Sequence, residues 1–223
     1  MSIAQPRLNV KLVSTHGGIT VGEDGTSHQS IEDLALACAL PGFSVIVPAD
    51  AIETAQVVRF AASNHGPFYI RLCRPALPLV CDDSYRFELG KAVVLRQGTD
   101  ATIIAIGVMV TAALEAADNL KREGIDCRVL NMSTLKPADE SAIIKAAVDT
   151  GAIVTAEEHL ENGGLGSIVA RVVAGKHPTP IDFIAIKDTY ASSGKPAQLL
   201  ERYGLTARDI QQAVKSVIKK KSI

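Results

Sequence analysis

The sequence has no tryptophan, and only 4% of its 223 residues are aromatic. Aromatic platforms on which nucleobases could stack would therefore be few. It also lacks an excess of either charge, because 23 Lys and Arg oppose 24 Asp and Glu for a formal net charge of -1. A near-neutral chain has no electrostatic footprint for nucleic acid or for an anionic membrane surface. We therefore expect neither nucleic acid nor a membrane among its partners.

Cysteine is scarce as well, and its spacing excludes a disulfide scaffold. No C-x-x-C pair occurs, and no cysteine–histidine cluster has the spacing of a zinc site. The four cysteines, expected to be reduced thiols, are Cys38, Cys73, Cys81 and Cys127. The first residues lack the apolar core of a signal peptide. The most apolar stretch, 101–117, is interrupted by polar residues and is shorter than the ~20 clean residues of a membrane span. These features predict a cytoplasmic protein.

Apolar patterning predicts an α/β fold in which strands and helices alternate. In the first half, strands are expected at 9–14, 43–47 and 68–72, and helices at 30–40 and 50–64. Short links between alternating elements are typical of parallel strands joined by right-handed crossovers. Asp50 opens the second helix, and Glu53 follows three positions later in the pattern of a capping box.

The segment 74–84 contains two prolines and no clean period, so we expect an interdomain linker. Beyond it the alternation restarts, with strands at 91–95, 101–106, 127–131, 153–157 and 183–186. Helices are expected at 110–122, 139–149, 167–174, 196–203 and 206–220. The chain is thus predicted to have two domains with mostly parallel sheets: a partial domain at 1–80, a linker at 81–90 and a second domain at 91–223.

The first domain is too short to stand alone. About 80 residues fall below the usual domain size of ~100–150 residues. Its sheet begins almost at Met1, and nothing before Asn9 covers its edge. An open sheet edge must be paired or covered. Either a partner chain supplies the rest, or the polypeptide is a fragment.

The segment 15–29 carries the most chemistry, because it combines four glycines with two histidines and two acids. It follows a predicted strand and precedes a helix, which is where open parallel sheets bind ligands. Its polar side chains suit substrate binding and proton transfer. Two other interpretations remain open: a glycine-rich turn with solvated polar residues, and a metal site formed by His16, Asp24 and His28. No further His, Asp or Glu lies at a recognised ligand interval, which argues against the metal.

Several ordered motifs resemble those of the transketolase family. They are TH…GEDG…HQ from Thr15 to Gln29, LPG at 40–42, VPAD at 47–50, GPFYIRLCR at 66–74, LKP at 135–137, TAEEH at 155–159, GGLG at 163–166, SGKP at 193–196 and YGL at 203–205. They cover essentially the whole chain. The resemblance is to the C-terminal section of a transketolase, which some organisms encode as a separate subunit. It implies an incomplete pyrimidine-binding domain followed by a three-layer transketolase C-terminal domain.

The resemblance also implies site residues. Transketolases transfer a two-carbon ketol unit between sugar phosphates of the pentose phosphate pathway by means of thiamine diphosphate. His16 and Arg74 would bind the sugar phosphate, and Asp24 would accept a hydrogen bond from the hydroxyl next to the carbonyl. His28 would hydrogen-bond the donor's ketol oxygens and serve as the catalytic residue. For Arg74 an exposed linker arginine is the alternative, and Arg71 is a second candidate phosphate ligand.

Departures from the family bear on the cofactor. Only 15 residues precede His16, so the family's upstream glutamate and the aromatic residues around the cofactor ring are missing. Thiamine diphosphate with magnesium would therefore be held mainly by regions absent from this chain. The expected partners are an N-terminal transketolase subunit and a second copy in a homodimer. The alternatives are a non-catalytic dimerising fragment, or a subunit of deoxyxylulose-phosphate synthase or of a 2-oxoacid dehydrogenase (β).

Two features of the second half stay open. Glu157, Glu158 and His159 look like a catalytic cluster by composition, although the family has no catalytic residues there. We favour a role at a strand end or an interface. The glycines at 163–166 precede a helix and could cradle an anion on free amides, but a tight turn is the simpler interpretation.

Overall fold

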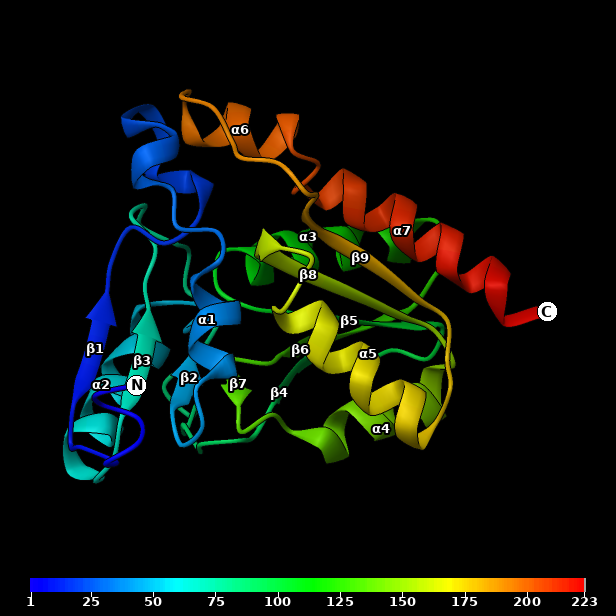
Figure 1. Ribbon diagram of the computed structural model, residues 1–223. Coiled ribbons are helices and arrows are strands. Elements are labelled where there is room, and N and C mark those ends of the chain that lie inside the picture. Colours follow the sequence, from blue (N-terminus) through cyan, green and yellow to red (C-terminus); the bar gives the residue numbers. More distant parts are fainter. Residues whose placement is uncertain (223) are drawn as a thin grey trace.

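The computed structural model describes residues 1–222, which form two β-sheets with helices on their faces (Figure 1). The first sheet has the order β1-β3-β2-β7. Its strands are β1 (Lys11–Ser14), β2 (Ser44–Ile46), β3 (Phe68–Arg71) and β7 (Thr134–Lys136). β1 and β2 both pair in parallel with β3, which confirms the parallel arrangement expected for the first half.

The second sheet has the order β4-β6-β5-β8-β9. Its strands are β4 (Val93–Arg96), β5 (Ala101–Ala105), β6 (Cys127–Asn131), β8 (Ile153–Leu160) and β9 (Ile181–Ile186). Four of the five strands are parallel, and β4 is antiparallel to β6. An α/β fold with mostly parallel sheets is thereby confirmed.

Helices cover both faces of the second sheet. The helices of the chain are α1 (Asp33–Ala39), α2 (Ala51–Ser63), α3 (Met109–Arg122), α4 (Glu140–Thr150), α5 (Leu165–Lys176), α6 (Pro196–Arg202) and α7 (Ala207–Lys219). Along β5, Ile103 belongs to the core under α3 and α7, whereas Ile104 belongs to the core under α4 and α5. Successive side chains of a strand point to opposite faces, so a continuous apolar strand suits a sheet that is covered on both sides.

One core runs through both halves of the chain. The cluster that contains Ile104 also contains Leu34 of α1 and Val45 of β2. Ala4 belongs to the same cluster, so the first residues pack against the interior rather than along the outer edge of β1. The two halves therefore bury their apolar side chains against each other.

Two features of the fold, the place of β7 and the packing of the linker, were not predicted. β7 lies in the second half of the sequence, yet it pairs antiparallel with β2 and supplies the fourth strand of the first sheet. The linker is also packed, because the Asp50 carboxylate accepts hydrogen bonds from the backbone N–H of Val80 (2.8 Å) and Cys81 (2.7 Å). Burial alone would raise the pKa of Asp50, but these bonds and the one from Glu53 N–H hold it below its usual value.

The expected capping box at Asp50 is only half right. Asp50 caps α2 by accepting from the N–H of Glu53 at 2.8 Å. The Glu53 side chain reaches the N–H of Ala49 (2.7 Å) instead of that of Asp50, and it also accepts from Tyr85 and Asn131. Glu53 is fully buried, so it joins α2, the linker and the second sheet rather than serving as a local cap.

Candidate functional site

The loop between β1 and α1 lies at the carboxyl edge of the first sheet, beside α6 (Figure 1). It contains two short 3₁₀ segments, Ile19–Asp24 and Thr26–His28. The N–H of Gly17 donates to the carbonyl of Leu72 (3.0 Å), which holds the start of the loop against the end of β3. The loop and the segment that follows β3 therefore share one edge, as parallel strands require.

Asp24 and Arg74 meet at this edge. Arg74 Nη1 lies 3.1 Å from Asp24 Oδ2 and donates to the carbonyl of Val21 at 2.6 Å. Both side chains are nearly half exposed, at 44% for Arg74 and 47% for Asp24. Arg74 is therefore a loop-binding residue at the candidate site rather than an isolated linker arginine.

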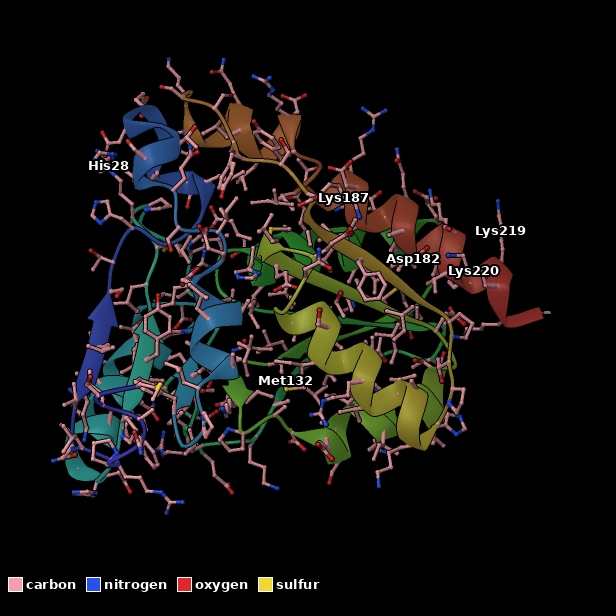
Figure 2. The ribbon with its side chains drawn as sticks, viewed as in Figure 1. His28, Met132, Asp182, Lys187, Lys219 and Lys220 are labelled. Carbon is pink, nitrogen blue, oxygen red and sulfur yellow. The ribbon has the colours of Figure 1, made fainter. Side chains whose placement is uncertain are left out.

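The two histidines lie on the same loop but bond only to their neighbours. His16 Nδ1 lies 2.8 Å from Thr15 Oγ1, and His28 Nδ1 lies 3.0 Å from Ser27 Oγ. Both rings are exposed, and Figure 2 shows His28 at the outer side of the loop. Among the described residues, no hydrogen bond joins either ring to the Asp24–Arg74 pair. His16 has φ +63°, a strained conformation for a residue with a side chain.

Gly17 and Gly18 allow the loop to approach charged side chains of the protein itself. A Cβ on Gly17 would lie 2.4 Å from Arg71 Nε, and one on Gly18 would lie 2.2 Å from Glu158 Cδ. Gly18 also has φ +85°, which favours glycine. These two glycines therefore serve close packing beneath the loop.

Arg71 is not a surface phosphate ligand. It is 5% exposed, and its Nε lies 3.0 Å from Asp33 Oδ2. Its Nη2 donates to the carbonyls of Ser30 (3.1 Å) and Glu158 (2.9 Å). The guanidinium is thus buried among partners of the protein itself, so Arg71 does not share the exposed surface of Arg74.

Glu157, Glu158 and His159 are buried near the end of β8, between the two halves of the chain. The strand continues past Glu157, where the sequence predicted its end, to Leu160. Burial raises the pKa of Glu157 to about 7 despite hydrogen bonds from Gly166 and Leu165, and burial also raises that of Glu158. Burial lowers the pKa of His159, whose Nδ1 bonds the carbonyl of Leu160 at 2.7 Å. An interface role for this cluster agrees with its burial.

The glycine-rich turn before α5 binds a carboxylate of the protein itself. Glu157 accepts from the N–H of Leu165 (2.7 Å) and from that of Gly166 (2.8 Å). A Cβ on Gly164 would lie 2.0 Å from Glu157 Oε2, so only glycine fits there. Because the free amides of the helix start are already taken, the turn offers no cradle for an external anion.

A groove of about 410 Å³ opens between α2 and the segment that follows β3. It is lined by side chains of α2 and of the segment after β3, among them Asp50, Thr54, Leu72, Cys73, Pro75 and Leu77. Burial raises the pKa of the Cys73 thiol, which keeps it protonated and a poor nucleophile. The largely apolar lining of this groove suits a flat or apolar group.

Sequence reasoning missed the contacts that hold the loop from the far end of the chain. The N–H of Thr20 donates to Glu158 Oε1 at 2.6 Å, and Gln29 Nε2 donates to the carbonyl of Ser192 at 3.0 Å. Ser193 Oγ donates to the carbonyl of Glu23 at 2.7 Å. No local sequence pattern predicts these bonds, because they join residues more than 130 positions apart.

No group of three or more His, Cys, Asp or Glu side chains within residues 1–222 could hold a metal ion. No helix in the same range is long and apolar enough to cross a membrane. At the end of α7, Lys219 projects outward (Figure 2). Lys220, just beyond α7, pairs with Asp182.

A four-stranded α/β unit followed by a larger, five-stranded α/β unit defines the class of this fold. Residues 1–80 match the family model of the transketolase pyrimidine-binding domain, and residues 90–210 match that of the transketolase C-terminal domain. The chain therefore belongs to the transketolase family and corresponds to its C-terminal section.

Curated relatives agree with this assignment. A putative transketolase C-terminal section of Methanocaldococcus jannaschii is 42% identical over 221 residues, which are 98% of this chain and 69% of the relative. A 6-deoxy-6-sulfo-D-fructose transketolase subunit of Clostridium sp. (strain MSTE9) is 39% identical over 222 residues, covering all of this chain and 69% of the relative.

Solved structures share the fold. A split gene transketolase in an inactive β4 tetramer superposes with a TM-score of 0.92 at 47% identity, covering 98% of this chain and 71% of that one. A transketolase from Pichia stipitis superposes with a TM-score of 0.80 at 24% identity, with 98% and 31% covered, and this likeness concerns the fold alone.

Proposed function

We propose that this chain acts within a transketolase that transfers a two-carbon ketol unit from a ketose phosphate to an aldose phosphate, completed by an N-terminal part or subunit. The observation that carries the proposal is the meeting of Asp24 and Arg74 at the carboxyl edge of the first sheet, 3.1 Å apart and half exposed. His16 and His28 flank them on the same exposed loop. The domain bounds 1–80 and 91–223 are part of this proposal.

Each side chain of the loop suits one part of a sugar phosphate. The planar guanidinium of Arg74 matches phosphate oxygens in a bidentate geometry, with His16 as a second ligand. Asp24 would accept a hydrogen bond from the hydroxyl beside the carbonyl, and His28 would bond the ketol oxygens and act on their protons. An exposed ion pair contributes only ~0–1 kcal/mol, so a substrate can replace the Asp24–Arg74 contact at small cost.

The residues of this chain fit the sugar phosphate and do not fit the cofactor's metal diphosphate. Asp24 stands next to one arginine, and residues 1–222 hold no cluster of metal-ligating side chains. Thiamine diphosphate, where bound, supplies the nucleophilic carbon and the electron sink of ketol transfer. We propose that the rest of the assembly holds its diphosphate and magnesium.

A split-gene assembly supports the choice of partner. Two curated relatives carry the word "subunit" in their names, and one similar structure is a β4 tetramer of a split gene transketolase. We propose an N-terminal transketolase subunit as the partner, a homodimer as the unit of assembly and the cytoplasm as the location. Subunits of deoxyxylulose-phosphate synthase or of a 2-oxoacid dehydrogenase (β) are less consistent with the family match.

A direct assay tests the proposed function. The chain is combined with an N-terminal transketolase subunit, thiamine diphosphate and magnesium, and transfer from a ketose phosphate to an aldose phosphate is followed. We expect transfer with the wild-type chain and a strong loss with His28→Ala. A stable complex that transfers nothing from any ketose phosphate would contradict the proposal.

A second candidate function is a non-catalytic assembly of this chain alone. The observation that favours it is the outer edge of β1, where Leu12 and Val13 are 39% and 47% exposed. Within the described residues, β1 pairs only with β3. Self-association through that edge without any ketol transfer in the assay above would favour this candidate.

A further inference from the structure

The loop that carries Asp24 and His28 is bound by both halves of the chain. The first half holds Gly17 and Val21 through Leu72 and Arg74, and the second half supplies four further hydrogen bonds. Thr20, Thr26 and Gln29 donate to Glu158, Ala191 and Ser192, and Glu23 accepts from Ser193. The candidate site residues face outward, while the inner side of the loop rests on the C-terminal domain.

Glu158 is the buried anchor of this contact. It is 2% exposed, and its Oε1 lies 2.6 Å from the N–H of Thr20, four residues before Asp24. Gly18 packs directly on its carboxylate, at a distance that leaves no room for a Cβ. A charge-assisted hydrogen bond in a buried setting is stronger than one in water and costly to break.

The two ends of the loop are joined to each other by a backbone hydrogen bond. The N–H of Gly18 donates to the carbonyl of Ser30 at 2.7 Å, which closes the loop. Arg71 then donates from a single nitrogen to the carbonyl of Ser30 and to the carbonyl of Glu158. Glu158 therefore bonds the loop directly through its side chain at Thr20, and its backbone carbonyl is linked to Ser30 through Arg71.

We propose that Glu158 is a positioning residue of the second half of the chain, which fixes the conformation of loop 15–30 and so the placement of Asp24 and His28. The inference deepens the proposed function and rests on it for the identity of the substrate. It assigns the C-terminal domain a part in forming the sugar-phosphate site. Glu157, the adjacent buried acid, bonds α5 instead of the loop and provides a matched control.

Amide hydrogen exchange of the full chain tests the proposal without any activity measurement. We expect Glu158→Ala to speed exchange in residues 17–30 by about tenfold or more, while β5 stays as protected as in the wild type. Glu158→Gln should restore much of the protection, because its amide oxygen can still accept from Thr20 N–H. Glu157→Gln should speed exchange at the start of α5 and leave the loop unchanged.

A second variant approaches the same contact from the loop. Gly18→Ala places a methyl group against the Glu158 carboxylate and strains a positive φ, so it should also speed exchange in residues 17–30. It carries the test if Glu158→Ala does not fold. Unchanged loop exchange in a folded Glu158→Ala or Gly18→Ala protein would overturn the proposal. A uniform rise that includes β5 would overturn it too, since that result marks a role in global stability only.

An activity measurement separates this inference from the proposed function. In the assembled enzyme, Glu158→Ala should lower kcat/KM for the ketose phosphate more than Glu157→Gln does, and Glu158→Gln should recover most of the loss. If exchange changes as expected but no transketolase activity exists, the proposed function fails and the positioning role of Glu158 stands. If activity exists and Glu158→Ala matches the control in both measurements, the positioning role fails alone.

Discussion

Arg74 Nη1 and Asp24 Oδ2 lie 3.1 Å apart although 50 positions separate the two residues. β1 and β3 are parallel neighbours, so the segments that follow them leave the sheet at the same edge. The pair therefore results directly from the order β1-β3-β2 and needs no long insertion to form.

Replacement of Asp24 tests its role toward a sugar hydroxyl. In the assembled enzyme, Asp24→Ala should lower kcat/KM for an acceptor that carries the hydroxyl by tenfold to a hundredfold, or about 1–3 kcal/mol. The reason is that the hydroxyl of the bound sugar, buried in the complex, loses its hydrogen-bond partner. An acceptor without that hydroxyl should lose little. Steady-state kinetics with both acceptors provides the measurement, and an equal loss for both would mean that Asp24 is structural.

Replacement of Arg74 separates phosphate binding from loop support. Arg74→Ala should weaken the binding of phosphorylated sugars and leave the binding of unphosphorylated sugars unchanged, because only the phosphorylated sugars lose a bidentate partner. Arg86→Ala, which removes an exposed arginine bonded within the linker, serves as the control. Competition between phosphorylated and unphosphorylated acceptors measures the difference. A similar loss for both kinds of sugar would indicate that Arg74 acts through its bond to Val21.

The buried carboxyl of Glu157 should make stability depend on pH. Its pKa is raised by burial from 4.5 to about 7 in the folded chain, so the folded state binds the proton more readily than the unfolded state. The free energy of unfolding should therefore fall as the pH rises from about 4.5 to about 7, by on the order of 1–3 kcal/mol for this group.

Urea unfolding at several pH values checks this dependence. Glu157→Gln should be less stable than the wild type at low pH, because the amide has only one oxygen to accept from the N–H groups of Leu165 and Gly166. Its free energy of unfolding should nevertheless vary less than that of the wild type between about pH 4.5 and pH 7. Glu161→Gln, which changes a partly exposed carboxylate just beyond the same strand, is the control and should keep the wild-type slope. Parallel pH profiles for wild type and Glu157→Gln would refute the assignment.

The open edge of β1 should mediate self-association. Leu12 and Val13 are exposed there, and an unpaired strand edge readily pairs with another chain. Val13→Lys should shift the chain toward the monomer in light scattering at micromolar concentration. Val148→Lys on α4 replaces an equally apolar exposed residue (59%) away from the edge and should leave the association state unchanged. A clean monomer for the wild-type chain would contradict the expectation of a homodimer.

The chain alone should bind thiamine diphosphate weakly or not at all and should not turn over ketose phosphates. The reason is that residues 1–222 offer no cluster of side chains for magnesium and its diphosphate. Calorimetric titration of the purified chain with the cofactor and magnesium decides the matter. Micromolar affinity would show that the described residues are sufficient after all.

The sequence allowed most of the fold to be predicted, because long apolar runs and helical spacing determine α2, α3, β5 and β6 locally. β7 escaped prediction since three residues carry no usable period, and its partner β2 lies about 90 positions away. The end of β8 was placed too early, because the charged run at 157–159 resembles a loop until its hydrogen-bond partners in α5, α1 and the 15–30 loop are known. Local patterns report propensity, whereas these buried acids depend on tertiary partners.

The same limit applies to the candidate site. His16, Asp24, His28 and Arg74 could be selected from motifs, and the structure brings Asp24 and Arg74 into contact. Glu158 could not be linked to the loop from sequence, because 138 positions separate it from Thr20. Arg71 appeared equivalent to Arg74 in sequence, yet one is buried and the other exposed.

The pairing of β7 with the first sheet has a consequence for how the cleaved chain unfolds. Between β6 and β7 the chain crosses from the second sheet to the first through Met132 and Ser133 alone, so the first sheet contains strands from both sides of the linker. A protease cut between 74 and 90 would leave two pieces still held by a shared sheet and a shared core. The nicked protein should therefore elute as one species until denaturant melts both sheets in a single transition.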